Sequence, residues 1–399
     1  MRYFMSVLIV ILFTGIVKPC TTAIVSGKCT VDGRPILWKH RDAASVDNKL
    51  MYFTDGKYNY IGLVSSEDQK GENVWAGCNS TGFAIMNSAS YNLIENDSIK
   101  FEDQEGILMK IALQQCSSVD EFEQLLKNLP KPLGVQANFG VIDAKGGAAY
   151  FETDQFNYVK IDVNDPKIAP FGFVIRTNYS FTGNPNTGYG YIRYNTANEL
   201  LNNAVAQNIL TPEYIFTEGA RCLKNSLTGV DLNTFKPITS FVTFVDFIPR
   251  SSSVASVVIQ GVKKDESPDL TVMWSVVGFP LTSAAIPVWV AAGEKLPVLV
   301  TPDENGIVPI CNYANILKNK CYPIKRGNGE NYIKIDELIN TSNTGILQKN
   351  RLLEKIIVNA TNEVIDIMRN SGFDKQSVIK HYEWLDKIIR SSYKENYDL

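Results

Sequence analysis

One cysteine stands where an export leader would end, and its type and position open it to three kinds of chemistry. Arg2 precedes an apolar run from Met5 to Val17, a pattern typical of a signal peptide, and Cys20 follows shortly after it. A cysteine here could carry a lipid anchor, form half of a disulfide, or become a nucleophile once cleavage makes it the first residue. The remainder of the chain has to decide among these.

A cysteine at the start of a mature chain carries two useful groups on one residue. Its thiol has an ordinary pKa of about 8.5, and its α-amine, with a pKa of about 7.7–8.0, can take the thiol proton. Such a nucleophile needs no histidine. The chain has only two histidines, His40 and His381, which disfavours a Ser-His-Asp triad and a histidine-based zinc site.

The bulk composition describes an ordinary globular chain. The 399 residues are 45% hydrophobic and 20% charged, with a net charge of -3, so nothing favours nucleic acid or an anionic membrane as a partner. No segment after the leader reaches about 18 uninterrupted apolar residues, and we expect a soluble mature chain. Membrane association is expected only if Cys20 is lipidated.

The cysteine count is odd, which leaves one thiol over in an exported protein. Six of the seven could pair, with Cys311 and Cys321 as the most local option and Cys20 as the natural free thiol. No CxxC spacing occurs, so a cysteine zinc site is not expected.

Hydrophobic periodicity predicts an α+β chain. Short strand-like runs separated by Gly, Asn and Asp fill residues 20 to about 300. Helical periodicity appears in five segments, at residues 106–116, 117–129, 193–207, 351–369 and 375–389. Ser117 and Ser118 with later acids make a capping signal at the start of the second segment. We expect a leader at 1–19, a main domain at 20–330 and a helical extension at 331–399. Groups of adjacent strands with helices between them favour a layered α+β domain over alternating βαβ units.

The stretch after Cys20 predicts a hairpin. If Asp32 and Gly33 form a two-residue loop, Cys20 faces Ser45 across the ladder. Alternation then puts Lys39 and Arg41 on the face of Cys20 and Asp42 on the other face, whereas a three-residue loop or one bulge reverses this. The sequence alone leaves the face open.

The same stretch, "CTTAIVSGKCTVDGRPILWKHRD", resembles the opening of the N-terminal-nucleophile (Ntn) cysteine amidohydrolases. That superfamily includes choloylglycine hydrolases, penicillin V acylases, isopenicillin N acyltransferase-like proteins and Cys dipeptidases. Its members open with Cys-Thr and reach an Arg/Lys-Asn-x-Asp motif about twenty residues later. Here that motif is Lys39-His40-Arg41-Asp42, with His40 in place of the usual Asn. Either Lys39 or Arg41 could fill the basic position.

Three later motifs follow in the order that the resemblance requires. "GCNSTGFAIMNSAS" places Asn87 where a backbone donor helps to hold the oxyanion, and "GFVIRTNYSFTG" makes Asn178 the side-chain oxyanion donor. "FIPRSSSVAS" supplies Arg250, which would support the nucleophile. The resemblance covers about residues 20 to 290. It implies a four-layer αββα sandwich of two antiparallel sheets and no metal or organic cofactor.

Other residues with chemical potential have simpler interpretations. Glu152 and Asp154 could be paired acid/base carboxylates, but a solvated strand end is the better interpretation. Ser251–Ser253 lack a GxSxG context, which argues against a serine nucleophile. His40 has no partner at ligand spacing and is expected to be structural. Specificity is expected from loops such as 91–104 and 179–190.

These observations together predict an exported amidohydrolase that cleaves a linear, non-peptide amide through Cys20. Its substrate would be a small acylated amine or a short peptide. Acyl transfer of the isopenicillin N type, a Cys dipeptidase, and a non-catalytic lipoprotein or binding module are the alternatives. The predicted site residues are Cys20, Lys39, Arg41, Asp42, Asn87, Asn178 and Arg250.

Overall fold

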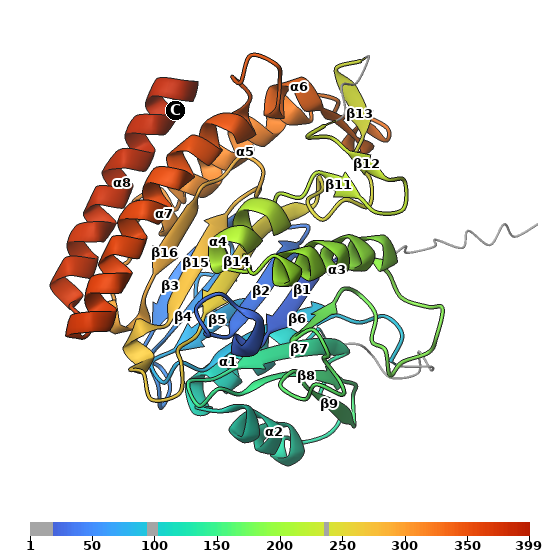
Figure 1. Cartoon of the computed structure of the whole chain (residues 1–399), viewed down its shortest axis with the longest axis vertical. Helices are drawn as coiled ribbons and strands as arrows, with labels where there is room; N and C mark the ends of the chain where they lie inside the picture. The colour runs from blue at the N-terminus through green and yellow to red at the C-terminus, as the bar shows by residue number, and fades with distance from the viewer. Residues whose placement is uncertain (1–18, 94–102, 235–238) are drawn as a thin grey trace, which may run out of the picture.

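Two antiparallel sheets stack face to face in the computed structural model, with helices on both outer sides (Figure 1). The structure describes residues 19–93, 103–234 and 239–399. The predicted leader therefore lies outside the described residues except at its last position, as does the 94–102 part of the predicted specificity loop. The predicted α+β four-layer sandwich is confirmed.

The first sheet has six strands, and the cysteine lies directly before one of them. Its order is β10-β1-β2-β14-β15-β16, and the strands are β1 (Thr21–Val25), β2 (Ile36–Asp42), β10 (Phe173–Arg176), β14 (Ser253–Gln260), β15 (Val272–Val277) and β16 (Ala285–Val288). Every residue of β2 is buried. A strand covered on both faces explains why its sequence does not alternate cleanly between apolar and polar residues.

The second sheet is a meander of seven strands in chain order. Its members are β3 (Asn48–Phe53), β4 (Tyr60–Ser65), β5 (Ala76–Asn79), β6 (Ala84–Ala89), β7 (Ala137–Ile142), β8 (Ala148–Thr153) and β9 (Tyr158–Asp162). Two small ribbons stand outside the sandwich, namely β11 (Lys224–Asn225) with β12 (Val230–Asp231), and β13 (Phe241–Thr243) with β17 (Tyr332–Lys334).

Helices α1 (Glu105–Gln115) and α2 (Val119–Asn128) cover the seven-stranded sheet. The predicted cap of α2 is confirmed, because the Ser118 hydroxyl accepts the Glu121 amide while the Glu121 carboxylate accepts the Ser117 amide at 2.6 Å. This reciprocal pair satisfies donors that a helix start leaves open and fixes where α2 begins.

The other helices lie on the side of the six-stranded sheet (Figure 1). They are α3 (Tyr191–Ala206), α4 (Pro212–Tyr214), α5 (Pro309–Cys321), α6 (Ile335–Leu338), α7 (Ile346–Ser371) and α8 (Lys375–Tyr397). Helices α7 and α8 run side by side over β16 and share the main hydrophobic core. In the described part of the chain, no helix is long and apolar enough to cross a membrane.

A fully buried ion pair ties α7 to the sandwich. Arg221 donates to both carboxylate oxygens of Glu354 and to the Pro280 and Ser283 carbonyls. The domain boundary expected at residue 330 stays a prediction. Strand β17, which lies after that residue, pairs with β13, which lies before it.

The first two strands are not joined by a two-residue loop at Asp32 and Gly33. The register pairs Thr21 with His40 and Val25 with Ile36, so residues 26–35 connect the strands. The Ser26 hydroxyl caps a 3-10 turn at Gly27–Cys29, which takes the chain out of the ladder before Asp32 is reached. The turn signal at Asp32-Gly33 is real, since Gly33 has a φ of 75°, but it lies inside a longer connection.

Candidate active site

Cys20 lies directly before β1, the strand held between β10 and β2. Only 7% of its surface is exposed to solvent. Its main-chain nitrogen donates to Asn178 Oδ1 at 2.7 Å. Asn178 follows β10, so antiparallel pairing of β1 with β10 brings these two residues together across 158 positions of sequence.

Arg193 of α3 is a site residue that the sequence did not reveal. Its guanidinium donates to the Cys20 carbonyl, to Thr21 Oγ1 at 2.8 Å and to Asn178 Oδ1 at 2.9 Å. Burial lowers its pKa to about 9. A single arginine in a helical segment carries no motif, and only the packing of α3 against β1 and β10 shows where it points.

Strand register settles which face carries the thiol. Thr22 pairs with Lys39, and its hydroxyl accepts the Tyr150 hydroxyl of the other sheet at 2.9 Å. Cys20 is two residues earlier, so alternation places it on the same face, between the sheets. The observed register differs by an even number of residues from the one that a two-residue loop would give. Lys39 and Arg41 therefore lie on the same face as Cys20, as that loop would also have placed them.

Lys39 connects the two sheets beside the thiol. Its ammonium donates to the Trp75 carbonyl at 2.7 Å and to Asn87 Oδ1. Burial lowers the pKa of Lys39 to about 8, and the electrostatic interaction of Lys39 with Cys20 opposes that shift. Two predicted site residues, Lys39 and Asn87, are thus bonded directly. The backbone-donor role expected for Asn87 stays a prediction, and its side chain has a contact that the sequence did not reveal.

Arg41 has different partners. It donates to Asn48 Oδ1 and to Ser65 Oγ at 3.2 Å, and its guanidinium lies 4.8 Å from the centre of the Trp75 ring. Burial lowers its pKa to about 10. Lys39 rather than Arg41 therefore contacts another predicted site residue.

Asp42 and Arg250 form an ion pair on the opposite face of β2. The Arg250 Nε lies 3.1 Å from Asp42 Oδ2, and a second guanidinium nitrogen also donates to that oxygen. The same guanidinium donates to the Pro19 carbonyl at 3.3 Å. Asp42 thus reaches Cys20 through Arg250 and the peptide that precedes the cysteine.

A serine, a histidine and Asp42 also cluster here, but not as a catalytic triad. Ser253 Oγ donates to Asp42 Oδ1 at 2.6 Å and lies 2.9 Å from His40 Nε2. In a triad the histidine stands between the serine and the aspartate, whereas here the serine stands between the other two. Burial lowers the His40 pKa to about 4. This neutral histidine is a structural support for Asp42.

Glu152 corrects one interpretation. It is not a solvated strand end, because only 2% of its surface is exposed and its carboxylate pairs with Arg176 Nε at 2.6 Å. Strand β8 lies between β7 and β9, so its end is covered by neighbouring elements. Asp154 follows the end of β8, where it accepts the Phe156 and Asn157 amides.

The local pairing of Cys311 with Cys321, which the cysteine count left open, does not form. Cys311 and Cys321 stand at the two ends of α5. Ten residues of helix separate them by about 15 Å, far beyond disulfide reach. All seven cysteines are free thiols. Within residues 19–93, 103–234 and 239–399, no group of three His, Cys, Asp or Glu side chains could hold a metal ion.

No family model matches the sequence, and no curated protein matches it. Solved structures that resemble the chain include penicillin V acylase from Agrobacterium tumefaciens, at 13% identity and a TM-score of 0.41, covering 69% of this chain and 87% of that one. A conjugated bile acid hydrolase variant from Clostridium perfringens has 11% identity and a TM-score of 0.42, covering 68% and 92%. An ortholog of N-acylethanolamine-hydrolyzing acid amidase from Caenorhabditis elegans has 16% identity and a TM-score of 0.39, covering 60% and 92%.

At such identities and TM-scores, the assignment of an activity rests on the geometry of the site.

Proposed function

We propose that this chain, once cleaved before Cys20, is an exported Ntn-type amidohydrolase that cleaves a linear, non-peptide amide. The observation that carries the proposal is the bond from the Cys20 nitrogen to Asn178 Oδ1 at 2.7 Å, with Arg193 bonded to the same oxygen. A side chain is thus dedicated to the main-chain nitrogen of a cysteine. Such a contact is useful if that nitrogen becomes a catalytic amine.

Cleavage before Cys20 would leave the thiol and the α-amine on one residue. The thiol would attack the substrate carbonyl carbon while the amine takes its proton, and the amine would then pass that proton to the departing nitrogen. Water would hydrolyse the resulting thioester. Lys39 and Arg41 lie on the face of the thiol, so their charges lie on the side of the reacting centre.

The developing oxyanion needs donors. The oxyanion role proposed for Asn178 falls to its Nδ2, which also donates to the Ala89 carbonyl at 2.9 Å. The Asn87 backbone is the second proposed donor. Losing one donor of this type lowers kcat by about 10²–10³-fold in known enzymes.

An acyltransferase would differ only in its last step, where an amine replaces water, and a Cys dipeptidase would differ in the leaving group. A lipoprotein would have the α-amine blocked. Export and the substrate, a small acylated amine or short peptide, are part of this proposal.

The first test is the intact mass of the exported protein before and after mild iodoacetamide treatment. A mass that begins at Cys20, with one rapid alkylation mapping there, supports the proposal. A retained leader or a lipid on Cys20 would exclude the mechanism for that form of the protein. Once a fluorogenic acyl amide is found by screening, activity that survives Cys20→Ala would reject Cys20 as the nucleophile. Loss of activity in a folded Asn178→Ala variant would support the oxyanion assignment.

A further inference from the structure

A pocket of 540 Å³ opens next to Asn178. Residues 179–191, which connect β10 to α3, form almost all of its wall. Asn92, from the segment after β6, completes the wall. Its volume lies within the range of about 300–1,000 Å³ that is usual for small-molecule sites.

The pocket wall is aromatic and uncharged. Tyr179, Phe181, Tyr189 and Tyr191 contribute rings, and the other lining residues are Asn, Ser, Thr, Gly and Pro. Tyr191 is 65% exposed. A charged ligand group would lose water here without meeting an opposite charge, which is costly. A ring-shaped, uncharged group can pack against these aromatic side chains.

The pocket is attached to the candidate active site through main-chain pairing. The Asn178 amide donates to the Tyr189 carbonyl, and the Tyr189 amide donates to the Asn178 carbonyl, both at 3.1 Å. The pocket wall and the residue that holds the Cys20 nitrogen therefore belong to one hydrogen-bonded unit.

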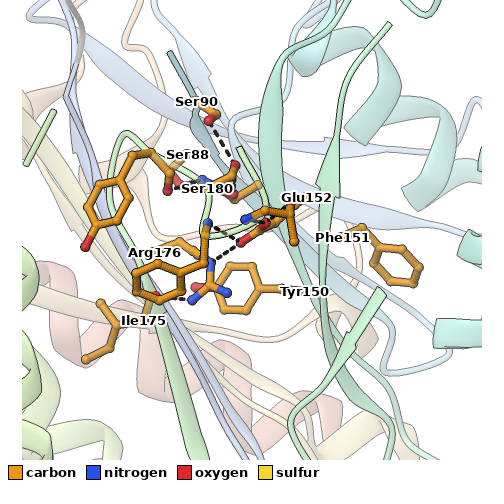
Figure 2. Close-up of polar contacts among 12 residues, drawn as sticks. Ser88, Ser90, Tyr150, Phe151, Glu152, Ile175, Arg176 and Ser180 are labelled. Atoms are coloured by element: carbon orange, nitrogen blue, oxygen red, sulfur yellow. Dashed lines mark hydrogen bonds and ion pairs between the residues drawn. The ribbon is translucent and has the colours of Figure 1, made fainter. Parts of the chain in front are cut away.

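Glu152 of β8 holds the first half of this loop in place. Its carboxylate accepts the Phe181 amide at 3.0 Å, the Thr182 amide at 2.8 Å and the Thr182 hydroxyl. Arg176 pairs with the same carboxylate, and its guanidinium lies 4.3 Å from the centre of the Phe181 ring. Figure 2 shows Glu152 and Arg176 pointing toward one another at the base of the loop.

Asn92 fixes the loop from the other side. Its side chain donates to the Ser180 carbonyl at 2.8 Å and to the Asn184 carbonyl at 3.1 Å, and it accepts the Ser180 amide at 2.7 Å. Ser180 also bonds Ser90, as drawn in Figure 2. A loop held by this many buried or partly buried hydrogen bonds is preformed, so binding of a ligand would not cost the conformational entropy of ordering the loop.

We propose that the 179–191 loop binds an uncharged, ring-bearing part of the substrate, and that Glu152 is the positioning residue that keeps this pocket in shape. The inference rests on the proposed amidohydrolase function for its place in catalysis. Binding to the pocket can nevertheless be measured separately from turnover.

The test uses the Cys20→Ala protein, which cannot turn over a substrate by the proposed mechanism, and calorimetric titration with three probes. Phenylacetamide is neutral and has a ring, hexanamide is neutral without a ring, and phenylacetate has a ring and a charge. We expect phenylacetamide to bind at least fivefold more tightly than either of the others. Equal binding of all three, or preference for phenylacetate, would overturn the inference.

Two surface variants locate the binding site. Tyr191→Ala removes an exposed ring of the pocket and should weaken phenylacetamide binding at least fivefold. Phe171→Ala removes a ring that is 59% exposed but does not line the pocket, and it should leave the affinity within twofold. An equal effect of both variants, or no effect of Tyr191→Ala, would place the ligand elsewhere and overturn the inference.

Two further variants test the positioning role of Glu152. Glu152→Gln should weaken phenylacetamide binding about tenfold, the equivalent of about 1.4 kcal/mol. In a Glu152→Gln protein that retains Cys20, the rate of iodoacetamide alkylation at Cys20 should be unchanged. Because Glu152→Gln could unfold the protein, Thr182→Val supplies a milder change that removes only the hydroxyl bond, with an expected two- to fivefold loss. Unchanged affinity in Thr182→Val would contradict the positioning role. Failure of Cys20 to react or to cleave any amide would reject the proposed function, and the binding results would remain informative.

Discussion

Replacing Arg193 with methionine should lower kcat strongly while leaving the protein folded. The guanidinium bonds the Cys20 carbonyl, Thr21 Oγ1 and Asn178 Oδ1, so it aligns the nucleophile with the residue proposed to hold the oxyanion. One hydrogen bond with a charged partner contributes about 1.5–3 kcal/mol. If the Asn178 bond alone acts in the transition state, its loss corresponds to a fall in kcat of about 10- to 150-fold at 25 °C.

The fold should tolerate this change. No carboxylate in the described residues forms an ion pair with Arg193, and burial already lowers its pKa to about 9, which shows that its charge is poorly solvated. Removing a desolvated charge offsets part of the hydrogen bonding that is lost. We expect the free energy of unfolding to change by about 1–2 kcal/mol, the range of ordinary single substitutions.

The assay is steady-state hydrolysis of a fluorogenic acyl amide by the processed protein, with urea unfolding of the same samples. Arg193→Lys is the matched control, since it keeps one donor and the charge and should lose less kcat than Arg193→Met. A kcat within threefold of the parent protein, or a loss matched by unfolding, would refute the reasoning.

Three further predictions concern the two faces of β2. The pKa of Lys39 is about 8, so its charge is lost as pH rises through 8, and kcat/KM should fall there. In Lys39→Arg, this alkaline limb of the pH–rate profile should move up by at least one pH unit. The His40 pKa of about 4 lies below its ordinary 6.5, so the unfolded chain binds more protons between these values and stability rises with pH across that window. Urea unfolding at pH 7 and pH 5 should therefore differ by about 2 kcal/mol more in the parent than in His40→Asn; equal differences would contradict the burial argument. Asp42→Asn leaves the Arg250 charge unpaired and should cost about 3–5 kcal/mol, and the double variant with Arg250→Gln should recover part of that loss, whereas additive losses would show that the ion pair is not coupled.

Local patterns in the sequence predicted many elements because those elements have local causes. Helix α8 begins at Lys375, where the Asp374 carboxylate caps its first turn, and the predicted periodicity starts at the same residue. Strands β3, β4 and β16 have weaker local signals. Their residues are apolar without clear alternation, or the strand is short, and only pairing with neighbours in the sheet makes them strands.

The candidate site was predictable where the chain itself brings residues together. Lys39 and Cys20 share a face because β1 and β2 are neighbours in sequence, and an even shift of register preserves that relation. Long-range positions were predictable only through motif resemblance, as for Asn178 and Arg250. Arg193 and Trp75 had neither route, since their contacts depend on how α3 and the second sheet pack against β1 and β2.

The charges around Cys20 explain how a cysteine site can work without a histidine. Lys39 and Arg41 face the side of the thiol, whereas Arg193 and Arg250 contact the carbonyls on either side of the Cys20 nitrogen. Each cation is buried or nearly so, and burial alone would make such a cluster unstable. Arg250 is paired with Asp42, whereas Lys39, Arg41 and Arg193 form no ion pair with a carboxylate in the described part of the chain, so a developing oxyanion at Cys20 is the charge that these three lack. The site is therefore arranged to favour negative charge at the one place where the proposed reaction creates it.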